Sequence, residues 1–515
     1  MKKVANLLKT VLLSRLSPVF FALFSAIGVI LNYSYRVGYI FVDGALFSNF
    51  SMMLFVFAVA ATVILTFIGS FSMKNSKICN KKAIIAFQII AEIFTIIIGI
   101  YNIVNIIVGK RESFAAALGL FKQSFPFWLA CLCVASALFV IPYLKSKSVK
   151  KALCAITAAI MLFSIYASIF QVVPFEFESS PAVFDNGNGY SVVFATSDKS
   201  VAYVEYDYNG RHIKKFDEDN GRKIGDRKVH SIQVPYKELS NNSYNVGATR
   251  VIDELSYGGR LGKTIKSENI KFNDNFGDDV NLLTISDWHT HNKLAKQTIK
   301  YLGNYNAVAL LGDSAPGIMF EDDVANYLVS FAGDLTEGKI PVIFVRGNHE
   351  TRGEMASHLS SLLKMDKFYY KTSLGNYDFI VLDSSEDKDD SHPEYGSMDV
   401  YGENRKKMVK WLDSLENSNK KTIAMSHAKE ICMEEDLSKN AYDKLESLNT
   451  SFLACGHEHI SEFTDSSPFP ILIDGGIDAD GSGTYVASML KLTPQNITVI
   501  SVDSNNKTLV NETVK

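Results

Sequence analysis

Five apolar runs before residue 174 constrain the fold more than any other feature of the sequence. They cover residues 16–33, 50–71, 83–108, 126–144 and 152–173. Each is close to the roughly 20 residues that an α-helix needs to cross a bilayer. The sequence therefore predicts an N-terminal α-helical transmembrane region of five helices over residues 1–173. No small-residue cleavage site follows the first run, so we expect a retained helix there rather than a signal peptide.

The charge of the chain changes at the same place. Residues 1–173 contain 16 Lys and Arg but only three acids, which is a balance of +13. Subtraction from the totals of 52 basic and 55 acidic residues leaves 36 bases and 52 acids for the rest, a balance of −16. This division excludes a single soluble globule. The acidic part offers no basic face for phosphates, so no nucleic-acid partner is expected.

Basic residues in the short loops between the runs predict an orientation. Twelve Lys and Arg fall on the side of the N-terminus and four on the other side. Such an excess is typical of the cytoplasmic side, and an odd number of spans then places the rest of the chain outside. We therefore expect a multi-pass protein of the cell membrane, with the lipid bilayer as a partner. Glu92 lies on a polar stripe of the third run, which favours a packing seam over an intramembrane site.

Residues 174–280 have the pattern of a small β-domain. Short alternating runs at 190–195, 201–206, 229–234 and 244–252 are separated by turn-rich segments such as 185–189. Several short strands at this spacing are typical of a β-sandwich of the fibronectin or immunoglobulin kind. Nothing in the segment suggests catalysis, so a spacer or a substrate-shaping module is the predicted role.

Residues 281–515 alternate between strand-like apolar runs and helical segments, which predicts an α/β sandwich. In such sheets ligands bind at the carboxyl ends of the strands. The predicted strands are Leu282–Ile285, Ala307–Leu311, Val342–Val345, Phe379–Leu382, Thr422–Met425, Phe452–Ala454 and Ile471–Ile473.

Five of these runs are followed by residues able to bind a metal or a phosphate. They are Asp287 and His289, Asp313, Asn348 and His349, His427, and finally His457 and His459. Carboxylate and imidazole ligands suit Zn²⁺, Mn²⁺ or Fe, and no thiolate is offered. The ligand-type side chains are too many for one ion but suit two ions that share a bridging carboxylate, an arrangement able to clamp a phosphoryl group.

At these residues the chain resembles the calcineurin-like metallophosphoesterase family, whose pattern is D-x-H, G-D, G-N-H-[DE], H and G-H-x-H. The resemblance covers about residues 281–500 and implies two divalent or trivalent metal ions (Mn, Zn or Fe) and a phosphate-ester substrate. It implies that Asp313 bridges the ions and that His349 protonates the leaving oxygen, steadied by an acidic neighbour. The implied ligands of one ion are Asp287, His289 and His459, and those of the other are Asn348, His427 and His457. Asp287 and His349 are the implied catalytic residues, and Asn348, His349 and Arg352 the implied substrate-binding residues.

The surrounding sequence is similar to purple acid phosphatases. The β-domain ahead of the motifs, the Gly-Asn-His-Glu form at 347–350, and Tyr401-Gly402 leading to Trp411 carry this likeness. Pro316 stands where that group has a tyrosine, and His289 stands where its first motif has glycine. A tyrosinate-bound ferric ion is therefore not expected.

The sequence favours a membrane-anchored dimetal phosphoesterase that attacks phosphate esters with a metal-bound hydroxide outside the cytoplasm. Two alternatives stay open. One is a phosphodiesterase acting on a lipid, nucleotide or wall-polymer substrate, and the other is a non-catalytic membrane sensor with a phosphate-binding ectodomain. The loop 386–394 is expected to be a solvated surface loop, and Asp383 a structural cap. Cys432 and Cys455 are expected to be free thiols.

Overall fold

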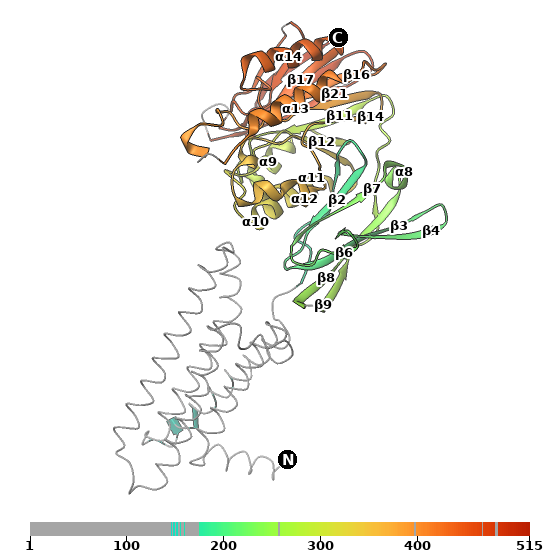
Figure 1. Cartoon of the computed structure of the whole chain (residues 1–515), viewed down its shortest axis with the longest axis vertical. Helices are drawn as coiled ribbons and strands as arrows, with labels where there is room; N and C mark the ends of the chain where they lie inside the picture. Colours follow the sequence, from blue (N-terminus) through green and yellow to red (C-terminus); the bar gives the residue numbers. More distant parts are fainter. Residues whose placement is uncertain are drawn as a thin grey trace. The chain divides into compact units, whose positions relative to one another are not determined.

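The computed structural model describes residues 175–255, 258–395, 398–465, 467–478 and 483–515, and a few single positions between 146 and 159 (Figure 1). Residues 175–251 and 261–515 form one compact unit. No helix within the described residues is both long and apolar enough to cross a bilayer. The predicted fold class is corrected accordingly: the described fold has no transmembrane bundle, and the five predicted spans lie outside the described residues except for single positions in the last.

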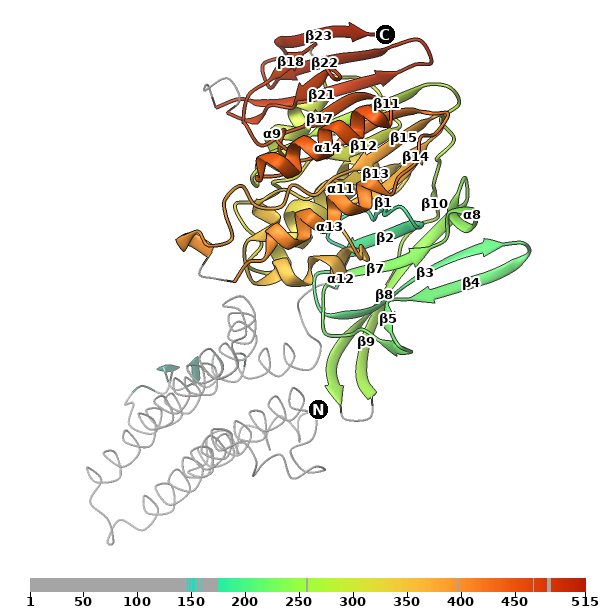
Figure 2. The same ribbon diagram turned by 45° about the horizontal axis from the view of Figure 1, so that its top comes forward.

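The first of two large sheets has ten strands around a parallel centre. Its central strands are β11 (Val280–Ile285), β12 (Ala307–Leu310) and β13 (Pro341–Phe344), with Val308 opposite Val342 in the register. One side is extended by antiparallel β21 (Tyr485–Leu492), β22 (Ile497–Asp503) and β23 (Thr508–Val514), which lie next to one another in Figure 2, and β20 (Gly476–Ile477) pairs with β21. The other side is extended by β1 (Ala182–Asp185), β2 (Tyr190–Ala195) and β7 (Val229–Val234).

The second large sheet has six strands, in the order β14-β15-β16-β17-β19-β18. These are β14 (Tyr370–Leu374), β15 (Tyr377–Val381), β16 (Lys421–Met425), β17 (Thr450–Cys455), β19 (Ile471–Ile473) and β18 (Glu462–Thr464). Strands β15, β16, β17 and β19 are parallel. Apolar side chains of the two sheets, among them Ile343 and Phe379, meet in one buried cluster, so the sheets pack face to face.

Helices cover the outer face of each sheet. The first sheet packs against α9 (Asn292–Ile299), η2 (Val324–Val329), α11 (Ser330–Thr336) and α12 (Leu359–Leu363). The second packs against α13 (Tyr401–Asp413) and α14 (Glu435–Ser447), which lie over β16 and β17 in Figure 1. Single turns complete the described helices: α8 (Tyr236–Leu239), α10 (Glu321–Asp323), η3 (His349–Thr351), η4 (Glu354–His358) and η5 (Pro393–Tyr395).

The separate small β-sandwich of the predicted fold class is also wrong. Strand β1 pairs in parallel with β13, with Val183 opposite Pro341, and β2 and β7 follow it into the ten-stranded sheet. The other strands form a five-stranded sheet that shares a buried cluster with β1 and β2. They are β3 (Ser200–Tyr208), β4 (Arg211–Phe216), β8 (Ser243–Leu255), β9 (Gly258–Lys266) and β10 (Ile270–Lys271), while β5 (Glu218–Asp219) and β6 (Arg222–Lys223) form a small hairpin.

The physical reason lies in the burial of β1 and β2. Every residue of both strands is buried, so these strands need apolar neighbours on both faces. An internal position in the large sheet, with helices on one face and the five-stranded sheet on the other, supplies both. The described architecture is thus an α/β metallophosphoesterase-like fold with mixed sheets.

Candidate metal centre

The seven predicted metal ligands meet where loops leave the carboxyl ends of five strands. Asp287, His289, Asp313 and Asn348 follow β11, β12 and β13 of the first sheet. His427, His457 and His459 follow β16 and β17 of the second. Because the two sheets pack face to face, both sets of loops reach the same place. Six of the seven residues, and also His349, belong to three overlapping groups whose ligand atoms lie within 4.8 Å of one another.

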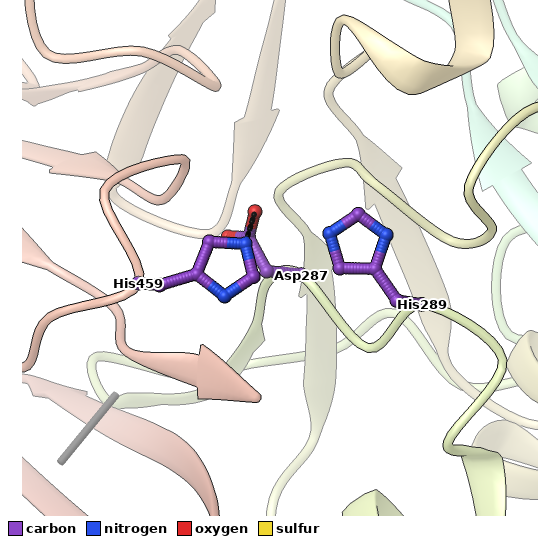
Figure 3. A group of neighbouring side chains, drawn as sticks. All are labelled: Asp287, His289 and His459. Atoms are coloured by element: carbon purple, nitrogen blue, oxygen red, sulfur yellow. Dashed lines mark ion pairs between the residues drawn. The ribbon is translucent and has the colours of Figure 1, made fainter. Parts of the chain in front are cut away.

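Asp287, His289 and His459 form the first group (Figure 3). Figure 3 shows the Asp287 carboxylate beside the His459 ring, and His459 Nε2 lies 3.5 Å from Asp287 Oδ1. The Nδ1 atom of His459 lies 2.7 Å from the Ile477 carbonyl oxygen, which leaves Nε2 to face the carboxylate. Burial lowers the pKa of His289, so a neutral, metal-binding ring is favoured there.

His427 and His457 form a second group with Asp313. His427 is buried, and its Nδ1 lies 2.7 Å from the Leu311 carbonyl oxygen. Its Nε2 lies 3.3 Å from Asp313 Oδ2 and 3.0 Å from the Asn348 side-chain oxygen. Burial lowers the pKa of His427, but the Asp313 carboxylate outweighs burial and raises this pKa to about 10. A metal ion must therefore compete with a proton for this nitrogen.

Asp313 lies between the two groups. Its Oδ2 atom is 3.3 Å from His427 Nε2 on one side and 3.8 Å from His289 Nε2 on the other. Its Oδ1 accepts a hydrogen bond of 2.9 Å from the His349 backbone. Burial raises the pKa of Asp313, but the charges of His427 and His349 outweigh it and lower the pKa well below its usual range. An ionised carboxylate in this position suits a bridging ligand.

Two buried oxygens test whether a cation fits. Asp287 Oδ1 has no hydrogen-bond partner among the described residues. The side-chain oxygen of Asn348 faces only acceptors, including the Asp313 carboxylate, and its nitrogen faces the Arg352 guanidinium. Exchanging the amide oxygen and nitrogen would satisfy these contacts by hydrogen bonds, with 3.1 Å to Asp313 Oδ2. A cation among the acceptors would satisfy the Asn348 oxygen and Asp287 Oδ1 without the exchange, so these oxygens fit a metal ion.

The backbone around the site is unusual. Asp287, His289, Asp313, His457 and His459 all have positive φ angles, between 36° and 72°. Non-glycine residues adopt this region rarely, and such strain concentrates at functional sites. Close backbone contact is one cause, because a Cβ atom on Gly347 would lie 2.5 Å from the Asp313 nitrogen. The glycines of the motifs therefore let the ligand loops approach one another.

His349 stands beside the metal ligands, with its Nε2 3.7 Å from Asp313 Oδ2. The predicted acidic neighbour does not hold its ring: Nδ1 lies 2.8 Å from the Pro316 carbonyl oxygen. Glu350 instead accepts hydrogen bonds from the backbone of Asp313, Ser314 and Gly347 and so ties the second and third loops together. Burial raises the pKa of Glu350.

Arg352 contacts both His349 and the loop that follows β15. Its Nη1 lies 3.2 Å from His349 Nε2. Its Nε and Nη2 donate to the two carboxylate oxygens of Glu386, each at 2.8 Å. Glu386 is 2% exposed, so the predicted loop 386–394 is not simply a solvated surface loop. The sequence did not indicate Glu386, because a run of acids carries no sign of which one is buried.

Other residues have structural positions. Asp383, predicted as a cap, forms a buried ion pair of 2.6 Å with Arg346. His291 precedes α9, with its Nδ1 3.2 Å from the Trp288 carbonyl oxygen. Cys432 and Cys455 are free and buried, as predicted.

Asp474, a second residue that the sequence did not indicate, is fully buried, and burial raises its pKa to about 8. Its position directly after β19 was the available signal.

Comparisons with known proteins agree with this geometry. Residues 280–461 match the family model described as calcineurin-like phosphoesterase. No curated protein matches the chain.

Solved structures with similarity include a predicted phosphoesterase from Streptococcus pneumoniae, with 14% identity over 46% of this chain and 97% of that one and a TM-score of 0.24. GAP50 of Plasmodium, titled the anchor in the inner membrane complex, has 12% identity over 46% and 89%, with a TM-score of 0.35. Phosphopantetheinyl hydrolase of Mycobacterium tuberculosis has 17% identity over 38% and 89%, with a TM-score of 0.28. None of these scores supports an argument about the substrate.

Proposed function

We propose, from the calcineurin-like phosphoesterase domain at residues 280–461, that this chain hydrolyses phosphate esters with the help of bound metal ions. The observation that carries the proposal is the position of Asp313. Its carboxylate lies between two groups of ligand-type side chains, 3.3 Å from one histidine and 3.8 Å from another. A single carboxylate in contact with two ligand groups suits two ions rather than one.

The two ligand groups would each hold one ion. Asp287, His289 and His459 would hold the first, His427, His457 and Asn348 would hold the second, and Asp313 would be shared. Zn²⁺, Mn²⁺ and Fe all suit nitrogen and oxygen ligands of this kind. When bound, such ions supply Lewis-acid stabilisation of the phosphoryl oxygens and lower the pKa of water.

His349 is the proposed general acid. The contact of its Nδ1 with the Pro316 carbonyl oxygen holds the ring so that Nε2 faces the site. In the hydrolysis, a water oxygen forms a bond to phosphorus and the bond from phosphorus to the leaving oxygen breaks. The leaving oxygen takes a proton from Nε2 of His349. Acid catalysis of this kind contributes about 10²–10⁴-fold to the rate.

The proposal is tested with the purified full-length chain, stripped of metal by a chelator and reloaded with Mn²⁺, Zn²⁺ or Fe²⁺. We expect about two ions per chain by elemental analysis and turnover of chromogenic phosphate esters. Asp313→Asn should lower both the metal content and the turnover, and Asp334→Asn, an exposed change on α11, should alter neither. A folded chain that binds two ions and hydrolyses no ester would favour the sensor function instead.

The cellular location of the domain stays a prediction from the sequence. It rests on the distribution of Lys and Arg before residue 174, of which the described residues include only Lys151. Protease accessibility of a C-terminal tag in intact cells tests it, and a protected tag would contradict an extracytoplasmic site.

A further inference from the structure

We propose that this site prefers phosphodiesters that carry an apolar substituent over phosphate monoesters. The inference rests on the proposed function and names its substrate class. Two separate features of the site support it: the charge around Arg352 is compensated, and exposed apolar side chains lie on the loops that surround the metal ligands.

Arg352 is the basic side chain in contact with the catalytic turn. Its guanidinium lies 3.2 Å from His349 Nε2 and 2.9 Å from the Asn348 amide, so it adjoins the place where phosphate would bind. Its charge is already paired, because Glu386 binds it through two hydrogen bonds of 2.8 Å. Asp387 lies 3.4 Å from the same guanidinium.

The pairing is part of the fold rather than a mobile surface contact. Glu386 is 2% exposed and also accepts hydrogen bonds from Thr351 at 2.7 Å and Tyr395 at 3.0 Å. Burial raises the pKa of Glu386, but Arg352 and Thr351 outweigh it and keep this pKa below its usual value. Glu386 is therefore ionised at neutral pH, and Arg352 offers little net positive charge.

The same loop carries further acids. Between residues 386 and 399 the only Lys or Arg is Lys388, beside one histidine, His392. The acids of this segment are Glu386, Asp387, Asp389, Asp390, Glu394 and Asp399. A phosphate monoester carries nearly two negative charges at pH 7, since its second pKa is about 6, whereas a diester carries one. An acidic rim opposes the doubly charged substrate more strongly. The charge of the loop thus favours a diester.

Exposed apolar side chains would receive the second ester group. The large hydrophobic residues on these loops are Met398, which is 87% exposed, Val400 (72%), Met319 (51%) and Ile460 (39%). Met398 donates a backbone hydrogen bond to Tyr395, whose hydroxyl binds Glu386. Val400 precedes Tyr401, whose hydroxyl binds the Thr351 carbonyl oxygen.

The other two residues adjoin the site from different loops. Met319 follows Ile318, whose backbone nitrogen donates to the Arg352 carbonyl oxygen at 2.8 Å, and Ile460 directly follows His459. Exposed apolar residues that are scattered singly need no explanation. The apolar part of the proposal therefore rests on the attachment of these four residues to loops that adjoin one site. A monoester has no second substituent to contact them.

The reaction is balanced with water alone. A water oxygen bonds to phosphorus and the bond to one ester oxygen breaks. That oxygen leaves as an alcohol with the proton from His349. The attacking water gives up two protons, of which one restores the proton on His349 and the other passes to the solvent. The product is a monoester with nearly two negative charges, which the acidic loop would repel from the site.

The first experiment compares kcat/KM of the metal-loaded full-length chain for three substrates. These are p-nitrophenyl phosphate and the methyl and octyl diesters of p-nitrophenyl phosphate. We expect the octyl diester to exceed the methyl diester at least threefold, and both diesters to exceed the monoester at least tenfold. A preference for the monoester would overturn this inference and leave the proposed function standing. No turnover of any ester would count against the proposed function itself.

Substitutions at the ion pair should move the preference in opposite directions. Glu386→Gln releases the charge of Arg352, so the ratio of monoester to diester kcat/KM should rise at least fivefold. Arg352→Gln leaves Glu386 uncompensated, so the ratio should fall. Asp413→Asn, an exposed change at the end of α13 and outside this loop, is the matched control. An unchanged ratio in a folded Glu386→Gln chain would contradict the role of the pair.

Binding gives a readout that does not depend on turnover. Isothermal titration calorimetry of the metal-loaded chain with octyl methylphosphonate, a singly charged diester mimic, should yield a Kd at least tenfold below that of inorganic phosphate. Glu386→Gln should narrow this difference by tightening phosphate binding. Met398→Ser should raise the Kd for octyl methylphosphonate at least threefold. Tighter binding of phosphate than of the octyl compound would overturn the inference.

Discussion

Single residues at the metal centre depend on one another through the backbone. His349 donates its backbone N–H to Asp313, and Glu350 accepts from the backbone of Asp313 and Gly347. The Asp313 carboxylate is therefore oriented by the same turn that carries the proposed acid, His349. Substitution of the proposed acid should therefore lower turnover without lowering metal content, whereas substitution of a metal ligand should lower both.

His349→Gln is the residue-scale test of that separation. We expect turnover to fall about 10²–10⁴-fold, because the leaving oxygen loses its proton donor. The loss should be larger for a diester with an alkyl alcohol as leaving group than for one that releases p-nitrophenol, which needs little protonation. The metal content should stay near that of the unchanged chain.

Steady-state kinetics and elemental analysis check both expectations. His358→Gln, an exposed histidine on the following turn, is the control. Equal losses for good and poor leaving groups would argue that His349 only binds the phosphate.

At the scale of elements, the loop after β17 is held against the loop after β11 at Gly456. A Cβ atom there would lie 1.6 Å from Ser286 Oγ and 2.6 Å from Asp287 Oδ2. The His457 backbone donates a hydrogen bond of 2.9 Å to the same carboxylate. The two sheets therefore meet at Gly456. Because this glycine has no side chain, His457 and His459 on the second sheet can reach Asp287 on the first.

Gly456→Ala should push these loops apart. We expect the first metal ion to be lost and the midpoint of thermal unfolding to fall, because overpacking of a buried contact costs about 1–3 kcal/mol. Elemental analysis and calorimetry measure the two effects. Gly317→Ala is the control, since its Cβ would have no neighbour closer than 3.5 Å. Full metal content in Gly456→Ala would show that the loops can rearrange.

The hairpin of β1 and β2 is tied to its neighbours by Asp185. This carboxylate accepts hydrogen bonds of 2.6 Å from Thr372 of β14 and from Tyr236 of α8. Burial nevertheless raises the pKa of Asp185 to about 6. Because this pKa is above the value near 3.9 in the unfolded chain, the stability that the group contributes is lost as pH rises from about 4 through 6.

Asp185→Asn removes this titration. Between pH 5 and pH 7 the unfolding free energy of the unchanged chain should fall by roughly 1 kcal/mol more than that of the variant. Denaturant unfolding at the two pH values measures the difference. The exposed change Asp219→Asn should leave the pH dependence as it is. A parallel pH dependence in Asp185→Asn would mean that this carboxyl group titrates normally.

For the whole molecule, the question is whether residues 281–515 can fold without the segment before them. Strand β1 covers the edge of β13, and the Phe184 ring packs at 6.3 Å against Phe344 in the core of the catalytic part. Without β1, β2 and β7, that edge and part of the helix-covered core would meet water. The chemistry at one end of the sheet thus depends on strands that contribute no ligand.

We therefore expect a fragment of residues 281–515 to lack a cooperative thermal transition and fixed aromatic packing. A fragment of residues 175–515 should show both. Calorimetry and near-ultraviolet circular dichroism compare them at equal metal concentration. A shorter fragment that folds cooperatively and binds metal would establish an independent domain beginning at residue 281.

The identity of the candidate site was determined by the sequence itself. Metal-ligand chemistry depends on residue type, and the ends of strands can be read from local patterns, so Asp287, Asp313 and His427 could be recognised before any fold was known. Each predicted apolar run of residues 281–515 coincides with a strand, and Ile471–Ile473 agrees to the residue. Three runs, Ala307–Leu311, Val342–Val345 and Phe379–Leu382, extend one residue past the end of their strand.

The tertiary structure alone decided how these pieces combine. A run such as Val192–Phe194 reports that a strand is buried, but not which sheet buries it, because strand pairing joins residues far apart in the chain. For this reason the runs of β2 and β7 predict a separate sandwich, although both strands extend the ten-stranded sheet. No strand was predicted for β1. Glu386 was likewise hidden among acids of one loop. Its role follows from Arg352, 34 residues away, and only folding brings the two charges together.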